Sequence, residues 1–208
     1  MKNTFLTLMI AAGTISPVAV AAQYKEPEKK DKQEVFYPQV SFDSLQAKKM
    51  LARGSATIKG VAFTKLKSGL IGKQVFGNRI LANQIRVVLL PVTPYFNAWY
   101  QLRKEKENTR KRRYVYLSND AYRYRLEAIT NSSGEFTFPE MKPGKYFLQG
   151  FLPYTENKYY HEYTGTASDG YNRTNYYDLK QYSVNHEDRI ETFVEVKENG
   201  EIVKVRLH

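Results

Sequence analysis

The sequence contains no cysteine, which excludes disulfides, a lipid attached to an N-terminal cysteine, and a cysteine nucleophile. Histidine is scarce, with three residues, and none stands in an H-x-H or H-E-x-x-H spacing. The chain also lacks a nucleophile elbow of the form G-x-S-x-G and the glycine-rich fingerprints of nucleotide sites. We therefore predict no catalytic residue, no cofactor and no metal site.

Long apolar runs are absent after the first 22 residues. Those residues combine a positive start at Lys2, an apolar stretch over 4–12 and small residues at 19–22. This order is typical of a cleaved signal peptide, and the apolar stretch is too short for a membrane span. We predict an extracytoplasmic protein, periplasmic, secreted or at the cell surface, with no transmembrane segment after cleavage.

Acidic residues are outnumbered, 21 against 32 Lys and Arg, which gives a formal net charge of +11. A positive balance favours partners that carry negative charge. Outside the cytoplasm these are anionic lipid, anionic polysaccharide or a protein of an envelope complex. Nucleic acid is disfavoured in that compartment.

Residues 23–41 are charged and carry two prolines, and they predict a flexible tether. Residues 42–208 then form one predicted domain. It opens with a short helix over 43–53, which Asp43 or Ser44 could cap and Gly54 could end. Without disulfides, its hydrophobic core alone must hold this domain together.

Strand patterns dominate the rest of the domain. Phe136 and Phe138 alternate with polar residues and are expected to face inward. Asn199-Gly200 is a strong hairpin signal and predicts that the last two strands pair with each other. The strands expected from such patterns cover 55–63, 84–92, 135–139, 145–152, 189–197 and 201–207.

Two long stretches interrupt the strands. In the first, over 93–125, Thr93-Pro94 predicts a helix start, and Phe96, Trp99 and Arg103 follow at helical spacing. The second, over 153–188, is rich in tyrosine, asparagine and threonine, and we expect a long loop there. Both stretches are expected to carry the specific function, because loops on a rigid scaffold usually do.

Residues 130–148 (TNSSGEFTFPEMKPGKYFL) follow a pattern of two turns and two short strands. They resemble the carboxypeptidase regulatory-like domain family, as do the unit Ile58-Lys59-Gly60-Val61 and the run into Pro91. The resemblance implies an all-β fold, a seven-stranded transthyretin-like (Greek-key) β-sandwich, here with two large loop insertions. It also implies a structural or binding module, since no catalytic residues belong to that fold itself.

Two groups of side chains could form a binding surface. Basic residues interleaved with tyrosines can attract and stack on a phosphate or sugar-phosphate partner, although such a run can equally be a solvated loop. Tyrosines provide rigid contact area, although the rings could instead fold back over the sandwich. The candidates are Arg103, Lys104, Arg110, Lys111, Arg112, Arg113, Arg123, Arg125, Tyr159, Tyr160, Tyr163, Tyr176 and Tyr177.

Three hypotheses on function follow. The leading one is an exported, non-catalytic binding or structural module that contacts an anionic envelope component or a protein through these two stretches. The second is a metal-dependent or carbohydrate-active enzyme with its site in 153–188, using His161 and Glu162 or His186 and Asp188. The third is an accessory subunit of an envelope complex.

Overall fold

The structure, a computed structural model, describes residues 32–65 and 79–208. The predicted signal peptide and most of the predicted tether lie outside these residues. Residues 33–208 form one unit by their contacts. No helix in the described part of the chain is long and apolar enough to cross a membrane.

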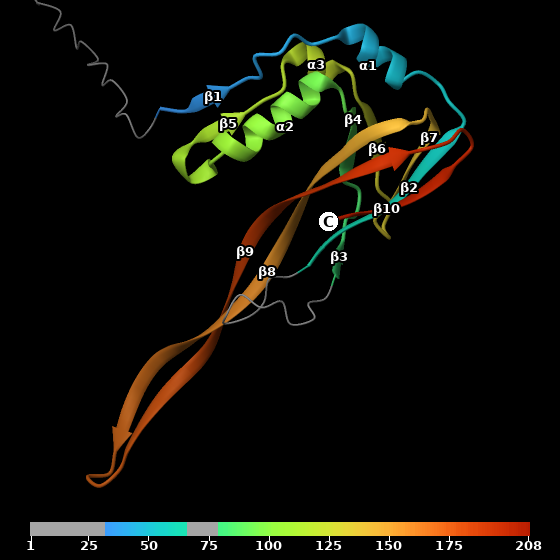
Figure 1. Ribbon diagram of the computed structural model, residues 1–208. Coiled ribbons are helices and arrows are strands. Elements are labelled where there is room, and N and C mark those ends of the chain that lie inside the picture. Colours follow the sequence, from blue (N-terminus) through green and yellow to red (C-terminus); the bar gives the residue numbers. More distant parts are fainter. Residues whose placement is uncertain (1–31, 66–78) are drawn as a thin grey trace, which may run out of the picture. The chain divides into compact units, whose positions relative to one another are not determined.

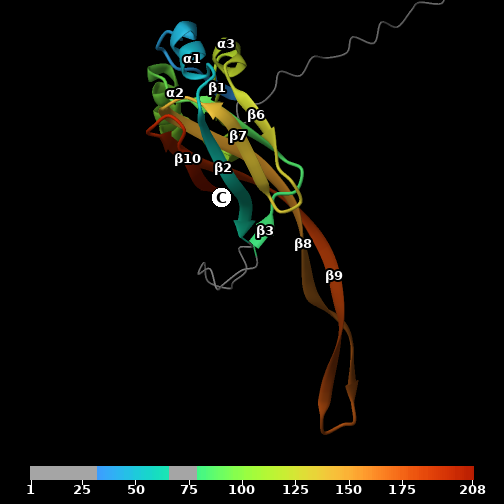
Figure 2. The same ribbon diagram turned by 90° about the vertical axis from the view of Figure 1, so that its right-hand side faces the viewer.

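Two four-stranded sheets pack face to face, as Figures 1 and 2 show. In the first sheet, β2 lies in the middle and pairs with the other three strands. The second sheet has the order β6-β4-β8-β9. The first sheet contains β2 (Ala56–Lys65), β3 (Arg79–Leu81), β7 (Glu135–Met141) and β10 (Ile202–Leu207). The second contains β4 (Arg86–Pro91), β6 (Leu126–Ile129), β8 (Gly144–Ser168) and β9 (Arg173–Val196).

The mostly β sandwich confirms the expected all-β fold class, and residues 32–65 and 79–208 contribute eight strands to its two sheets where seven were expected. The core lies between the sheets and contains the inward residues that alternation predicts. Phe136 and Phe138 come from the first sheet, and Leu89 and Leu148 from the second. Burying each such side chain stabilises the fold by about 1.5–3 kcal/mol.

The last strand pairs differently from the prediction. Asn199-Gly200 does form a turn, with Gly200 at φ 78°. However, β10 does not pair with β9; it crosses to the other sheet and runs parallel to β2, from Ile202 opposite Thr57 to Leu207 opposite Ala62. The physical reason is the free edge of β2, whose other edge is taken by β7. At that edge Leu207 is fully buried in the core.

The first insertion is mostly helical and covers the outer face of the second sheet (Figure 1). Thr93 caps α2 by accepting a hydrogen bond from the backbone N–H of Phe96 at 3.2 Å, as predicted. A second apolar cluster joins α2 to this sheet, with Phe96 and Trp99 against Leu90 and Phe147. The insertion contains α2 (Pro94–Lys106), the 3-10 turn η2 (Thr109–Lys111), β5 (Arg113–Val115) and α3 (Asn119–Arg123).

The N-terminal side of the domain differs in one respect from the prediction. The helix α1 (Ser44–Met50) is where expected, with Asp43 accepting from two backbone N–H groups at its start. Within the expected tether, however, β1 (Glu34–Phe36) is a strand that pairs in parallel with β5. The tether therefore ends before residue 34, because Val35 and Phe36 have β-forming side chains and a free strand edge to pair with.

The second insertion is not a loop. Residues 153–188, here called the arm, are the outer half of a continuous hairpin of β8 and β9, paired as far as Ser168 opposite Arg173. Figure 1 shows both strands extending past the sandwich. Tyrosine and threonine favour strands, and Asn157, Asn175 and Asn185, which suggested a loop, occupy paired positions.

Tyr146 gives the core a pH dependence. Its ring is fully buried and its hydroxyl donates toward the carbonyls of Lys142, at 2.8 Å, and Met50, at 3.1 Å. Burial raises the pKa of Tyr146 above its ordinary value of 10.0. The folded state keeps this proton where the unfolded chain has lost it, so the free energy of unfolding should fall as the pH rises through and above 10.0.

This expectation can be checked by urea denaturation at a series of pH values from neutral to above 10.0. Tyr146→Phe should be less stable at neutral pH, because it loses its hydrogen bonds at about 0.5–1.5 kcal/mol each. It should also lose less stability than the wild type as the pH rises. An equal slope for the two proteins would contradict the assignment.

Candidate functional site

A cleft of about 670 Å³ lies between the end of α2, the segment 114–122 and the outer face of β8 and β9. Aromatic rings form much of its wall, and the polar groups lie among them. The lining residues are Tyr37, Leu90, Trp99, Arg103, Glu107, Thr109, Tyr114, Val115, Tyr116, Leu117, Asn119, Tyr122, Gln149, Phe151, Glu187 and Arg189. Another hollow, of about 720 Å³ on the first sheet, is lined by charged and small residues around Phe136 and has no comparable aromatic wall.

Tyr114 and Tyr116 present two parallel aromatic rings to the cleft. Tyr114 is in β5 and Tyr116 follows it two residues later, so both side chains lie on one side of the extended chain. Their ring centroids are 6.1 Å apart and their planes differ by 1°. Tyr116, Tyr122 and Phe151 are each about half exposed. These rings offer apolar area at the surface that a ligand could cover.

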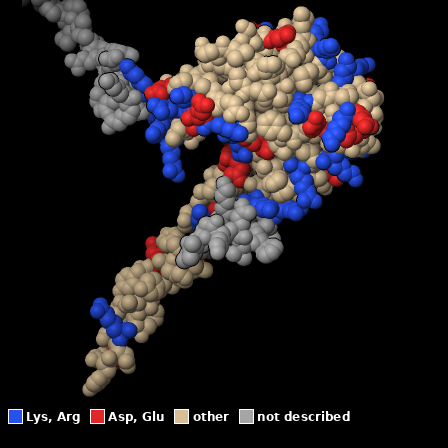
Figure 3. Space-filling model, in the orientation of Figure 1, with Lys and Arg blue, Asp and Glu red and all other residues tan. Residues whose placement is uncertain are grey.

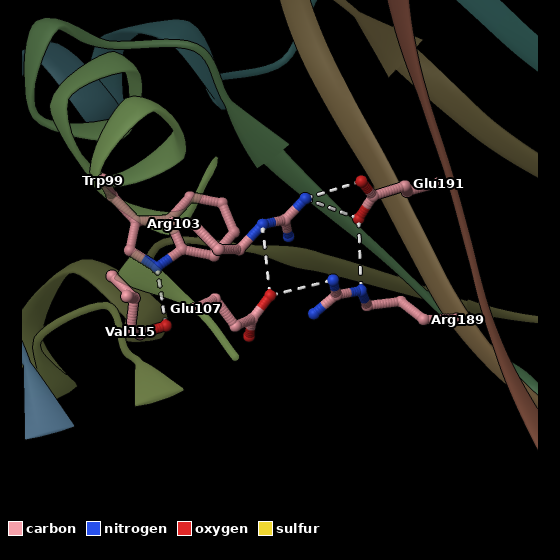
Figure 4. A network of polar contacts seen from close by, with 6 residues as sticks. All are labelled: Trp99, Arg103, Glu107, Val115, Arg189 and Glu191. Carbon is pink, nitrogen blue, oxygen red and sulfur yellow. Dashed lines mark hydrogen bonds and ion pairs between the residues drawn. The ribbon is translucent and has the colours of Figure 1, made fainter. Parts of the chain in front are cut away.

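The base of the cleft is a network of two arginines and two glutamates (Figure 4). Arg103 of α2 is 5% exposed, and its Nη2 donates to Oε1 and Oε2 of Glu191 on β9 at 2.5 and 2.7 Å. Arg189 Nη2 lies 2.9 Å from Oε2 of Glu107, and this hydrogen bond raises the pKa of Arg189. The two positive charges of the arginines are balanced by the two negative charges of the glutamates, so the network does not require a bound anion.

Aromatic contacts hold Arg103 in place. Its guanidinium lies 4.7 Å from the ring centroid of Trp99 and 5.0 Å from that of Tyr100. Trp99 in turn donates a hydrogen bond from Nε1 to the carbonyl of Val115 at 3.2 Å. Arg103 Nη1 is buried without a hydrogen-bond partner, which leaves the pairing with Glu191 as the main compensation for its charge. The network therefore fixes α2 and β5 against β9.

The structure corrects one member of the predicted basic surface. Arg103 is buried in this network and is not available on the surface, because Glu191 lies opposite it in a strand distant in sequence. Arg113 pairs with Glu34 at 2.9 Å, and the Lys104 Nζ lies 4.4 Å from the Tyr100 centroid. Both are tied to neighbours on the protein.

The remaining basic candidates lie on the surface. Arg110 and Lys111 are in the exposed turn η2, which Arg112 ends at φ 53°. Arg125 pairs with Glu127 at 2.7 Å and its guanidinium lies 4.1 Å from the Tyr122 centroid, while Arg123 is 3.8 Å from Asp120. The turn η2 adjoins the cleft through Thr109 and Tyr114 and gives it a basic lip.

The tyrosine candidates are on the arm, and the arm is not basic. Tyr159, Tyr160, Tyr163, Tyr176 and Tyr177 are all exposed, so they do not fold back over the sandwich. Residues 153–188 contain six acidic and three basic residues, the opposite of the balance of the whole chain. Figure 3 shows few charged side chains along the visible face of the arm. The two predicted binding regions therefore differ in charge.

The histidines do not converge. His161 is paired with Leu179, and His186 with Tyr154, well separated along the arm and on opposite faces of it. His186 Nε2 lies 3.1 Å from Oε2 of Glu156, and Asp188 accepts a hydrogen bond from Thr64 at 2.6 Å. Within 32–65 and 79–208, no three His, Asp or Glu side chains gather where they could hold a metal ion. These residues of the arm therefore do not form a metal-binding cluster.

Tyr154 lies where the arm leaves the sandwich. Its ring stacks on that of His186, with centroids 5.0 Å apart. Burial, and then the nearby carboxylates of Asp188 and Glu156, raise the pKa of Tyr154. The tyrosine therefore remains neutral beside these two acidic groups.

Sequence reasoning missed the cleft itself. Its wall combines Tyr37, the tyrosines of 114–122, Phe151 and Arg189, which are far apart in the sequence. Only two local signals could have indicated it: the alternation of Tyr114 with Tyr116, and that of Glu187, Arg189 and Glu191 along one strand.

Comparison with known proteins gives the fold and little more. No family model and no curated protein matches the chain. A solved structure of a Pseudomonas aeruginosa protein, provisionally described as carbohydrate-binding, is similar to it with a TM-score of 0.52 and 19% sequence identity. The match covers 81% of this chain and 97% of that one. At this identity the similarity shows a shared mostly β fold.

Proposed function

We propose that this protein is an exported, non-catalytic binding protein that holds a polysaccharide in the aromatic cleft. The observation that carries the proposal is the pair of parallel rings of Tyr114 and Tyr116 beside the polar groups of Asn119, Gln149 and Arg189. We also propose that residues 1–22 direct export and that the sandwich is a member of the carboxypeptidase regulatory-like family.

The chemistry of the cleft fits a sugar ring. A pyranose has faces of C–H groups and edges of hydroxyl groups. The C–H faces can lie on the flat rings of Tyr114 and Tyr116, which cost little entropy to hold in place. The hydroxyls can exchange hydrogen bonds with amides and charged groups, as in other sites with an apolar wall and a few polar side chains. The described function of the Pseudomonas aeruginosa protein supports the same class of ligand.

The carboxylates at the base argue for binding without hydrolysis. Glycoside hydrolases need a carboxylic acid that donates a proton to the leaving oxygen. Glu191 and Glu107 are both within 3 Å of an arginine nitrogen, so both carboxylates take part in ion pairs of the network. We assign them a structural role, in which they hold the arginines in place and fix the shape of the cleft.

The basic lip widens the range of polymers that the cleft could attract. Arg110 and Lys111 lie in the exposed turn η2. They would draw a chain that bears occasional acidic groups toward the cleft, in a manner that salt weakens. This supports an envelope polysaccharide as the partner.

The test is a glycan array probed with protein produced from the full sequence, followed by titration of the best-bound saccharide. Trp99 lines the cleft, so its fluorescence should change on binding. We expect the double substitution Tyr114→Ala/Tyr116→Ala to lower the affinity at least about tenfold, which corresponds to about 1.4 kcal/mol. Tyr160→Ala, on the arm, is the matched control and should leave the affinity for short saccharides unchanged.

Two results would sink the proposal. One is an array on which no saccharide is bound above background. The other is a bound saccharide whose affinity is the same for the double variant, since its site would then lie elsewhere.

A further inference from the structure

We infer that the cleft continues along one face of the arm, and that its ligand is therefore a long, predominantly uncharged polysaccharide chain. The inference rests on the proposed function and adds the length and charge of the ligand. In this inference the exposed face of the arm binds the same polysaccharide chain that enters the cleft.

The register of the hairpin makes the two surfaces continuous. Pairing of β8 with β9 runs without a shift from Gly144 opposite Val196 to Tyr163 opposite Tyr177. Because side chains alternate along a strand, the face that carries Gln149 and Phe151 in the cleft continues through every second residue. On the arm this face, here called the cleft-side face, carries Thr155, Asn157, Tyr159, His161 and Tyr163 from β8, and Tyr177, Leu179, Gln181, Ser183 and Asn185 from β9.

The two faces of the arm differ sharply in charge. Between residues 154 and 163 and their partners 177–186, every Asp, Glu, Lys and Arg lies on the opposite face. There Lys158 lies 3.4 Å from Glu156, and Lys180 lies 3.5 Å from Glu162 and 3.8 Å from Asp178. The cleft-side face has no such group over five consecutive pairs of residues. Alternation in the sequence thus separates a charged face from an uncharged one.

The cleft-side face repeats the chemistry of the cleft. Tyr159, Tyr163 and Tyr177 are 61%, 56% and 54% exposed, so their rings offer apolar area to a ligand. Amides and hydroxyls lie between them and already exchange hydrogen bonds, for example from Ser183 to Asn157 at 2.8 Å. The charged groups of an acidic polymer would lose water on this face and find no opposite charge to compensate the cost of desolvation. A neutral sugar chain carries no charge and does not pay this cost.

The length of this face favours a polymer over a short saccharide as the ligand. Twelve residues separate Phe151 in the cleft from Tyr163 on the arm, which at roughly 3.3 Å per residue is about 40 Å. A saccharide of a few units fills the cleft alone, and only a long chain reaches both surfaces. The arm also gains from a covering ligand, because a two-stranded ribbon is marginally stable in water.

The experiment compares short and long neutral glucans that share the same backbone linkage. Maltopentaose is compared with amylose, and cellopentaose with hydroxyethylcellulose, by biolayer interferometry on the immobilised full-length protein. We expect one of the two pentamers to bind better, and the matching polymer to bind at least tenfold more tightly than that pentamer. For alginate, an acidic polymer, we expect the arm to add nothing to the affinity.

Variants on the two faces of the arm provide the matched comparison. The triple substitution Tyr159→Ser/Tyr163→Ser/Tyr177→Ser should bring the affinity for the polymer down to that for the pentamer, and leave the pentamer unaffected. Tyr160→Ser/Tyr182→Ser removes exposed rings from the charged face, where they lie 6.0 Å apart, and should change neither affinity. Far-ultraviolet circular dichroism of each variant checks that the sandwich is intact.

The outcomes separate this inference from the proposed function. Equal affinity for pentamer and polymer, or a triple variant that binds the polymer normally, overturns the inference and leaves the cleft as a site for short saccharides. Tighter, arm-dependent binding of alginate overturns the uncharged class. Sedimentation showing a dimer that the triple variant dissociates would make this face a contact between two copies, which also overturns it. Absence of binding to all of these sugars, together with an empty array, rejects the proposed function itself.

Discussion

Replacing Glu191 with alanine should lower the free energy of unfolding by about 3–5 kcal/mol, which is a large part of the stability of a domain. Glu191 is the residue that compensates the charge of Arg103, whose side chain is 5% exposed and whose Nη1 already lacks a partner. Without Glu191, the guanidinium would keep only Glu107, 4.0 Å from its Nε. A buried cation left without its partner is among the most costly single changes.

Urea denaturation can measure this loss, and the same strand supplies a matched control. Glu195 is also on β9 and lies 3.9 Å from Lys145, but both side chains are at least half exposed. Glu195→Ala should therefore cost less than about 1 kcal/mol. The double substitution Arg103→Met/Glu191→Leu removes both charges and should recover much of the stability lost in Glu191→Ala. Equal losses for the two alanine variants would contradict the role given to the network.

Replacing Phe147 with alanine should cost about 3–5 kcal/mol through the cavity that it leaves. Phe147 is fully buried at the centre of the aromatic cluster between α2 and the second sheet. Its ring centroid lies 5.1 Å from that of Phe96, 5.0 Å from that of Phe193 and 6.2 Å from that of Trp99. The loss of this ring would loosen the helix from the sheet as well as reduce buried area.

Phe193 provides the comparison within the same cluster. Its ring contacts those of Phe96, Tyr100 and Phe147 but is 46% exposed, so Phe193→Ala should cost clearly less than Phe147→Ala. Thermal and chemical denaturation would rank the two variants. Equal destabilisation of the two variants would contradict the central role of Phe147 in the packing of α2 against the second sheet. Saccharide binding should also weaken in Phe147→Ala, because Trp99 and Arg103 form part of the cleft wall.

Much of the sandwich could be predicted because its signals are local. Phe136 and Phe138 alternate with polar residues, and both proved to be buried. Asn131 and Gly134 predicted a turn; there Asn131 Oδ1 accepts from the backbone N–H of Glu135 at 2.8 Å and Gly134 has φ 73°. The cap at Thr93 likewise depends on residues three positions apart. Interactions of this range are visible in a single sequence.

The errors concern pairing between distant parts of the chain. Asn199-Gly200 correctly indicated a turn but could not show that β2 offers an edge to the strand that follows. The arm looked like a loop because its residues are polar, and only the register with the opposite strand reveals two faces. Arg103 looked solvated because Glu191, its partner, is 88 residues away. The cleft was missed for the same reason.

The arm also determines how the protein would respond to a mechanical load. Its two strands continue into the second sheet, where β8 lies between β4 and β9. Hydrogen bonds between antiparallel strands are perpendicular to the strand direction. Tension along a polymer lying on the arm would act parallel to the strands, so it would shear the hydrogen bonds between β8 and β4 all at once instead of opening them one by one. The continuous hairpin thus transmits a pull at its tip directly into the buried sheet of the sandwich.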